Sequence, residues 1–98
     1  MNIKQKRDGN KLTVCVEGRI DSNTFQALSD FFQKELAGVK ELTLDLEGVD
    51  YISSAGLRTI LFAQKTMDNQ GKMVVTHVNS DIMETFELTC FTDFLTIV

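Results

Sequence analysis

Two adjacent serines, Ser53 and Ser54, stand where an apolar strand gives way to an amphipathic helix. Residues 42–46 before them alternate Leu with Thr or Asp, which is typical of a half-buried strand. From Leu57 onward, apolar residues recur at roughly helical spacing. Backbone N–H groups at a helix start lack partners within the helix, so a serine there can cap them and a phosphate can bind them. The pair therefore indicates either simple helix caps or a site of phosphorylation.

The composition indicates one compact domain over residues 1–98. The formal net charge is −4, and 43% hydrophobic with 24% charged residues is ordinary for a soluble fold. Basic residues are scattered, which argues against a nucleic-acid-binding face. No apolar run approaches the roughly 20 residues that span a bilayer, and no signal-peptide pattern opens the chain. We therefore expect a cytoplasmic protein that neither binds nucleic acid nor inserts into membranes.

The metal-ligating residue types offer no complete site. Cys15 and Cys90 form no Cys-x-x-Cys pair, and the single histidine, His77, cannot complete a zinc site with them. Free cysteines are usually packed residues, so we expect both to be structural. We interpret His77 as a structural residue at a strand end. The sequence predicts no metal site and no cofactor.

The hydrophobic pattern predicts strands that alternate with helices after an opening hairpin. Residues 8–10 form its turn, residues 18–21 are expected to be a loop, and residues 22–24 supply caps for the first helix. This order, β-β-α-β-α-β-α-β, implies an α/β fold with a mixed, mainly parallel sheet packed with α-helices on one or both faces. The expected strands are 2–7, 11–17, 41–46, 72–77 and 94–98, with helices over about 25–36, 55–70 and from 79–81 onward.

Four segments, in order and spread over essentially the whole chain, resemble the STAS domain, the fold of bacterial anti-sigma-factor antagonists. Gly18-Arg19-Ile20-Asp21 is similar to the Gly-Glu-Leu/Ile-Asp corner of that family, and residues 44–52 are similar to its central strand and exit. Ser53-Ser54-Ala55-Gly56-Leu57 resembles its phosphorylation loop, and residues 86–91 resemble its closing turn. The resemblance implies a single STAS-type domain.

The resemblance also implies a protein-binding switch in transcription regulation. In that family the unphosphorylated antagonist binds a cognate anti-sigma factor, which in many systems is also a serine kinase. Phosphorylation of the loop serine ends the binding, and a PP2C-type phosphatase restores it. Ser54 matches the phosphoacceptor, with Ser53 as the alternative, and Asp21 matches the acidic residue beside the loop.

Several positions depart from the family pattern. Ser53 replaces the aspartate that usually precedes the acceptor, and Ala55 replaces the Ser or Thr after it. Arg19 stands where Glu is frequent, and Cys90 stands where Gly is frequent. The lost acidic residue favours an alternative function, a STAS subunit of an ABC-type lipid transporter that binds its ATPase without a phosphorylation cycle. A partner-switching protein with an output other than a sigma factor is a further alternative.

The expected partner surface surrounds the serine loop. Arg58, one helical turn beyond Ser54, is either a solvated charge or a partner for its phosphate, and Gly56 would let the backbone approach that phosphate. Asp21 either stabilises a helix start, or it orients the serine hydroxyl or holds the kinase's metal. Phe31 lies off its helix's apolar stripe and could add exposed apolar area. The expected contacts are Asp21, Ser22, Thr24, Ile52, Ser53, Ser54, Gly56, Leu57 and Arg58.

The sequence contains no recognisable catalytic constellation. It lacks a Gly-x-Gly-x-x-Gly or Walker pattern, and no spacing suggests a Ser/His or Cys/His pair. A serine without a neighbouring base is chemically inert. We therefore expect no enzymatic activity and no catalytic residues.

Overall fold

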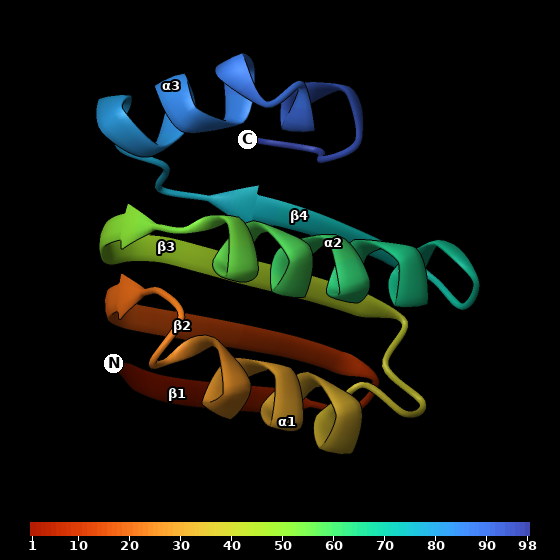
Figure 1. Cartoon of the computed structure of the whole chain (residues 1–98). Coiled ribbons are helices and arrows are strands. Elements are labelled where there is room, and N and C mark those ends of the chain that lie inside the picture. The colour runs from red at the N-terminus through yellow and green to blue at the C-terminus, as the bar shows by residue number, and fades with distance from the viewer.

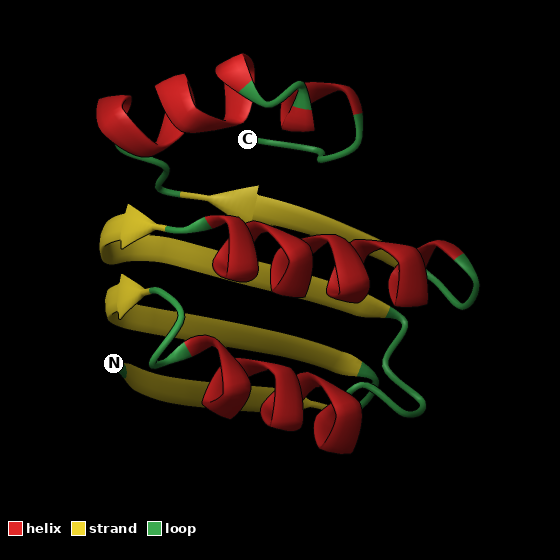
Figure 2. Cartoon of the chain, in the orientation of Figure 1, coloured by secondary structure: helices red, strands yellow, loops and turns green.

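The computed structural model describes all 98 residues, which form one four-stranded sheet and three α-helices (Figures 1 and 2). The strand order is β1-β2-β3-β4, with β1 antiparallel to β2 and the other two pairs parallel. The mixed, mainly parallel α/β architecture expected from the sequence is confirmed. The elements are β1 (Asn2–Asp8), β2 (Lys11–Ile20), α1 (Phe25–Glu35), β3 (Glu41–Ile52), α2 (Ser54–Asp68), β4 (Lys72–Thr76), α3 (Ser80–Leu88) and a 3₁₀ turn (Phe91–Asp93).

The opening hairpin turns through two residues, because Asp8 pairs directly with Lys11. Gly9 has φ +61°, a conformation that glycine adopts without strain and that such short turns require. β1 is the edge strand of the sheet, and only Ile3 of its seven residues packs against the core.

The two central strands are longer than the sequence predicts. β3 runs to Ile52 rather than ending at residue 46, and β2 includes residues 18–20, which were expected to form a loop. Two register shifts between these strands explain the difference. Each shift adds a residue on β3, so its later core residues, Leu46, Val49 and Ile52, are three apart rather than two. The strict alternation that identifies a strand is lost there.

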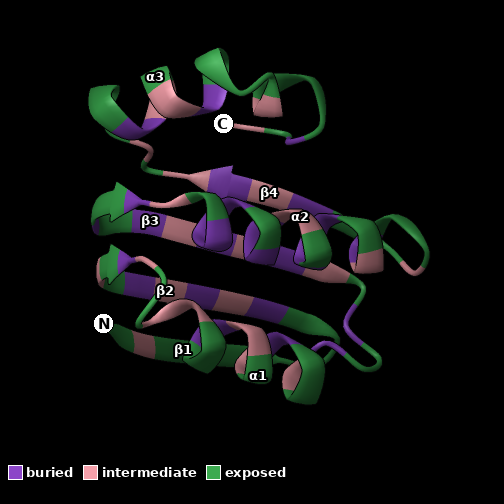
Figure 3. Ribbon diagram, in the orientation of Figure 1, coloured by how far each residue is buried: buried purple, intermediate pink, exposed green.

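The core lies between the sheet and the helices on one of its faces. α1 and α2 lie side by side across that face, while α3 lies beyond β4 (Figure 1). Buried residues alternate with half-buried ones along β2 and β3 (Figure 3), so the opposite face of these strands is open. The largest fully buried side chains come mostly from β2, β3 and the three α-helices and include Phe32, Phe86, Leu12, Ile20, Leu28, Leu44, Ile60, Met67 and Ile82.

The expected last strand, residues 94–98, is reduced to a single parallel bridge between Ile97 and Val75 of β4. The 3₁₀ turn occupies the residues before it and leaves little chain to pair. Cys90 begins this turn with φ +61°, and it is exposed. The expectation of a packed cysteine at this position was wrong, whereas Cys15 is partly buried. No helix combines the length and the apolar character needed to cross a membrane.

Candidate functional site

The serine loop starts α2 at the carboxyl end of β3. The Ser53 amide donates to the Ile20 carbonyl at 2.8 Å, which continues the pairing of β2 and β3 into the loop. The Ser53 Oγ then accepts from the Gly56 amide at 3.3 Å, and the Ser53 carbonyl accepts from the Leu57 amide at 2.9 Å. Ser53 is therefore the N-cap of α2, in the extended conformation usual for caps.

Ser54 is the first residue of α2, and its side chain does not take part in capping. The residue is exposed, and its hydroxyl makes no hydrogen bond within the protein. The backbone N–H groups of Ser54 and Ala55 precede the first intrahelical bond and have no carbonyl partner. Arg58 lies four residues further on, is also exposed, and makes no ion pair. The loop thus offers one free hydroxyl, two free amides and one free cation in the first turn of one helix.

The close packing of α2 against the end of β2 requires glycine at position 56. The residue is buried, and a Cβ at this position would lie 2.7 Å from Ile20 Cγ2 and 2.8 Å from the Ile20 carbonyl oxygen. Real Cβ contacts are not this short, so only glycine lets α2 approach the end of β2. The expectation that Gly56 lets the backbone approach a phosphate is therefore replaced by a structural role.

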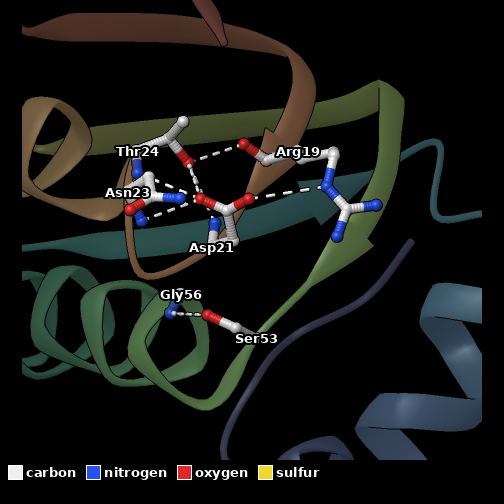
Figure 4. A network of polar contacts seen from close by, with 6 residues as sticks. All are labelled: Arg19, Asp21, Asn23, Thr24, Ser53 and Gly56. Atoms are coloured by element: carbon white, nitrogen blue, oxygen red, sulfur yellow. Dashed lines mark hydrogen bonds and ion pairs between the residues drawn. The ribbon is translucent and has the colours of Figure 1, made fainter.

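Asp21 organises the neighbouring corner, at the start of α1. Its Oδ1 accepts from the backbone amides of Asn23 at 2.9 Å and Thr24 at 3.1 Å (Figure 4). The Thr24 hydroxyl also lies 3.2 Å from Oδ1, and it lies 2.7 Å from the carbonyl of Arg19. The bond from the Asn23 amide is the main cause of a lowered pKa for Asp21. No hydrogen bond joins this carboxylate to Ser53 or Ser54, so the structure gives it the helix-start role.

Arg19 and Tyr51 form a part of this surface that the expected contact set omits. They pair across β2 and β3, and the Arg19 guanidinium lies 4.3 Å from the centre of the Tyr51 ring. The Arg19 Nε also lies 3.4 Å from Asp21 Oδ2, and the side chains of Arg19 and Tyr51 remain exposed. A stacked and ion-paired arginine beside an exposed tyrosine is typical of protein-binding surfaces. Their pairing depends on the second register shift, which no sequence pattern reveals.

The expected contact residues divide into an exposed set and a buried set. Ser22, Ser54 and Arg58 are exposed, and Asp21, Thr24 and Ser53 are partly so. Ile52 and Leu57 are only 5% and 7% exposed and belong to the hydrophobic core, so they offer a partner little area. Leu57 shares the helical stripe of Ile60 and Met67, which is the sequence signal for burial.

Phe31 is also less available than expected. It is partly buried against the core and makes an edge-to-face contact with Phe32, with ring centres 6.1 Å apart. Its aromatic ring therefore contributes to the packing of α1.

Comparison with known proteins gives a consistent result. A family model described as "Mlab, STAS domain" matches residues 3–97. BtrV of Bordetella bronchiseptica carries the name of an anti-sigma factor antagonist. It is 31% identical to this chain over 93 residues, and the match covers 93% of this chain and 80% of BtrV.

Solved structures share the fold at lower identity. A crystal structure of an anti-sigma factor antagonist from Mycobacterium paratuberculosis has a TM-score of 0.88 at 20% identity, covering 98% of this chain and 83% of that one. The phosphorylated form of the Bacillus cell fate determinant SpoIIAA has a TM-score of 0.76 at 9% identity, covering 99% and 91% of the two chains. Because the family model spans nearly the whole sequence and these structures share its architecture, the chain belongs to the STAS-domain family.

Proposed function

We propose that this chain is an anti-sigma factor antagonist whose binding is controlled by phosphorylation of Ser54. The unphosphorylated protein binds a cognate anti-sigma factor with serine kinase activity, and a PP2C-type phosphatase reverses the modification. The observation that carries the proposal is the different roles of the two serines at the start of α2. Ser53 is used as the cap, whereas Ser54 presents an exposed hydroxyl with no internal partner. The similarity to BtrV supports the antagonist role.

The surroundings of Ser54 suit a phosphate. A phosphoserine adds about −1.5 to −2 charges and three acceptor oxygens. The unpaired amides of Ser54 and Ala55 and the positive end of the α2 dipole favour an anion at this place. Arg58, at the i+4 position on the same helix, can approach it without a backbone change. We therefore expect the modification to leave the fold intact.

Loss of binding then arises at the interface. A dianion on Ser54 must be desolvated when a partner covers the surface, and it is repelled by acidic groups of the partner. Like-charge juxtaposition at an interface costs several kcal/mol, which corresponds to about a hundredfold loss of affinity or more. A rigid-body switch of this kind is in keeping with SpoIIAA, which has this fold in its phosphorylated form.

The role we propose is binding without catalysis. The Ser54 hydroxyl has no hydrogen bond to a histidine or a carboxylate, and a nucleophilic serine needs such a base. The Asp21 carboxylate at the start of α1 is bonded to the amides of Asn23 and Thr24, so it does not serve as that base.

The test combines modification mapping with a titration. The protein is purified from its native cells with its partner, and the phosphate is located by mass spectrometry of the 53–58 segment. The affinity of the purified partner is then measured for wild type, Ser54→Ala and Ser54→Asp. We expect Ser54→Ala to bind as wild type does and Ser54→Asp to bind about a hundredfold more weakly, for the electrostatic reason given above.

α3 supplies the matched control. Ser80 is the exposed first residue of α3, after its own cap Asn79, just as Ser54 follows Ser53. Ser80→Asp places the same charge at the equivalent position of a different helix, and it should bind normally. Equal affinities for Ser54→Ala and Ser54→Asp, or an equal loss in Ser80→Asp, would contradict the proposal.

One observation favours a second candidate, the STAS subunit of an ABC-type lipid transporter. Ser53, which stands where the family's antagonists usually carry an acidic residue, is fully accounted for as a helix cap. On this reading Ser54 is simply an exposed helical serine. A transporter ATPase in the purified complex, with an unmodified 53–58 segment and no effect of Ser54→Asp on affinity, would support this function instead.

A further inference from the structure

The open face of the sheet, away from α1 and α2, carries paired charges in place of a hydrophobic layer. Three of the ion pairs there join exposed lysines to glutamates: Lys4–Glu17, Lys11–Glu41 and Lys72–Glu41. The fourth pair is different, because it joins an imidazole to a largely buried carboxylate. His77 Nδ1 lies 3.3 Å from Asp45 Oδ1, and the Asp45 side chain is only 20% exposed.

Glu47 completes a group of three potential ligands with these two residues. One donor atom from each of Asp45, Glu47 and His77 lies within 4.8 Å of the others. Donor atoms bound to one ion at about 2.1 Å are separated by about 3 to 4 Å, so a small adjustment of exposed side chains closes this group around a cation. The group combines one nitrogen donor with two carboxylates, and is not merely a concentration of acidic charge.

The backbone around the group is fixed by three local features. Asp45 pairs with Cys15 on one side and with Thr76, the residue before His77, on the other. The first register shift follows directly, and there the Glu47 amide donates to Asp45 Oδ1 at 2.9 Å. His77 leaves β4 with φ +56°, a conformation unusual for a residue with a side chain, and this turn places its ring beside Asp45.

A concave site adjoins the group. It has a volume of about 300 Å³, and its lining includes Asp45, Glu47 and Cys15. Gly48 forms part of the wall, where a Cβ would lie 2.7 Å from Glu17 Cγ. The Cys15 Sγ lies 3.9 Å from Asp45 Oδ2, so this thiol donates weakly to Asp45 and lies beside the group of three.

We propose that Asp45, Glu47 and His77 bind a divalent transition-metal ion of the zinc class on the open face of the sheet. Imidazole suits Zn²⁺, Co²⁺ and Ni²⁺, and carboxylates complete their coordination. Three protein ligands leave positions for water, whereas Ca²⁺ requires six to eight oxygens and Mg²⁺ gains nothing from the nitrogen. This site is independent of the serine loop and does not require the phosphorylation switch.

The experiment is a titration of the purified full chain with Co²⁺, followed by absorption spectroscopy, and with Zn²⁺, followed by calorimetry. We expect one saturable site per chain. Removing a ligand should weaken binding by more than tenfold, judging from the roughly 10- to 100-fold effects of altering groups around metal sites. The variants are Glu47→Gln and His77→Asn, because asparagine tolerates the positive φ at this position while it lacks the imidazole.

Glu41→Gln is the matched control. Glu41 lies on the same face and contacts two lysines, but it is outside the group of three, so this variant should bind as wild type does. Circular dichroism of each variant verifies that the fold is retained. Two outcomes would overturn the proposal: no saturable site in wild type tighter than about 1 mM, or equal losses in Glu41→Gln, Glu47→Gln and His77→Asn.

Discussion

The starts of α1 and α2 lie next to each other at one end of the sheet, but their hydrogen bonding is very different. At α1, the Asp21 carboxylate contacts two backbone amides, a hydroxyl and a guanidinium. At α2, the Ser53 hydroxyl forms one bond at 3.3 Å, and the next residue, Ser54, is unbonded. One corner is saturated by its own residues, whereas the other retains free donors.

This difference in hydrogen bonding suggests different roles for the two corners. A saturated corner cannot accept a new group without losing bonds that it already has. The α2 corner can accept a phosphate at Ser54 because its free amides gain a partner and no existing bond is broken. The Asp21 corner lies beside it and holds Arg19 and Thr24 in fixed positions. We infer that the surface at the start of α1 stays unchanged, whereas the charge at the start of α2 changes on phosphorylation.

The largest effect on this comparison should come from Gly56→Ala, which attacks the packing under the α2 corner. The added Cβ meets a backbone oxygen and a buried side chain of Ile20, neither of which moves freely. We expect a loss of about 1–3 kcal/mol in the free energy of unfolding, the usual cost of overpacking a core. Urea denaturation measures it.

The sign of this effect is the critical result. Helix propensity alone would make alanine more favourable than glycine by about 1 kcal/mol. A stabilised Gly56→Ala variant would therefore contradict the close approach of α2 to β2. Arg58→Ala, on the same helical turn but exposed, serves as the control and should change stability by less than about 0.5 kcal/mol.

An intermediate effect should distinguish the two serines. Ser53→Ala removes the cap and should destabilise the protein by about 1 kcal/mol. Ser54→Ala removes an unbonded, exposed hydroxyl and should change stability by less than about 0.5 kcal/mol. Thermal or urea unfolding of the pair gives the comparison directly. Similar losses in both variants would show that the two hydroxyls share the capping role.

The smallest effect should be the pH dependence contributed by Asp21. Its pKa is lowered in the folded protein, chiefly by the Asn23 amide, so the ionised form favours folding. This contribution is complete above the ordinary pKa of about 4 and is lost as the pH falls through the lower folded value. The stability difference between wild type and Asp21→Asn should therefore shrink between pH 6 and pH 3, as measured by urea unfolding. A difference that stays constant would contradict the role of the charge.

Local patterns in the sequence predict the element order as far as α3 and the starts of the three helices, since caps, turns and apolar stripes are formed by residues close along the chain. The position of Ser54 after a strand and at the start of a helix follows from such patterns. The end of β3 does not, because two added residues interrupt the alternation of buried and exposed positions. The last strand is not predicted correctly either, because the 3₁₀ turn comes directly before it and only one bridge, between Ile97 and Val75, forms.

The remaining parts of the site depend on contacts between distant residues. The stacking of Arg19 on Tyr51 and the proximity of His77 to Asp45 both follow from the register of parallel strands. Composition does not specify that register. The burial of Leu57, by contrast, can be predicted from the helical spacing that it shares with other core residues. Its assignment to the partner surface was therefore wrong.

The exposure of β1 has a consequence for the behaviour of the protein at high concentration. Its outer edge pairs with no strand, and such an edge can recruit a second copy by backbone hydrogen bonding. Four of its seven residues are charged: Lys4, Lys6, Arg7 and Asp8. Edge-to-edge stacking would bring these charges together between copies, so they act as a barrier to aggregation. Neutral substitutions on this strand should therefore lower the concentration at which the protein precipitates while leaving its unfolding transition nearly unchanged.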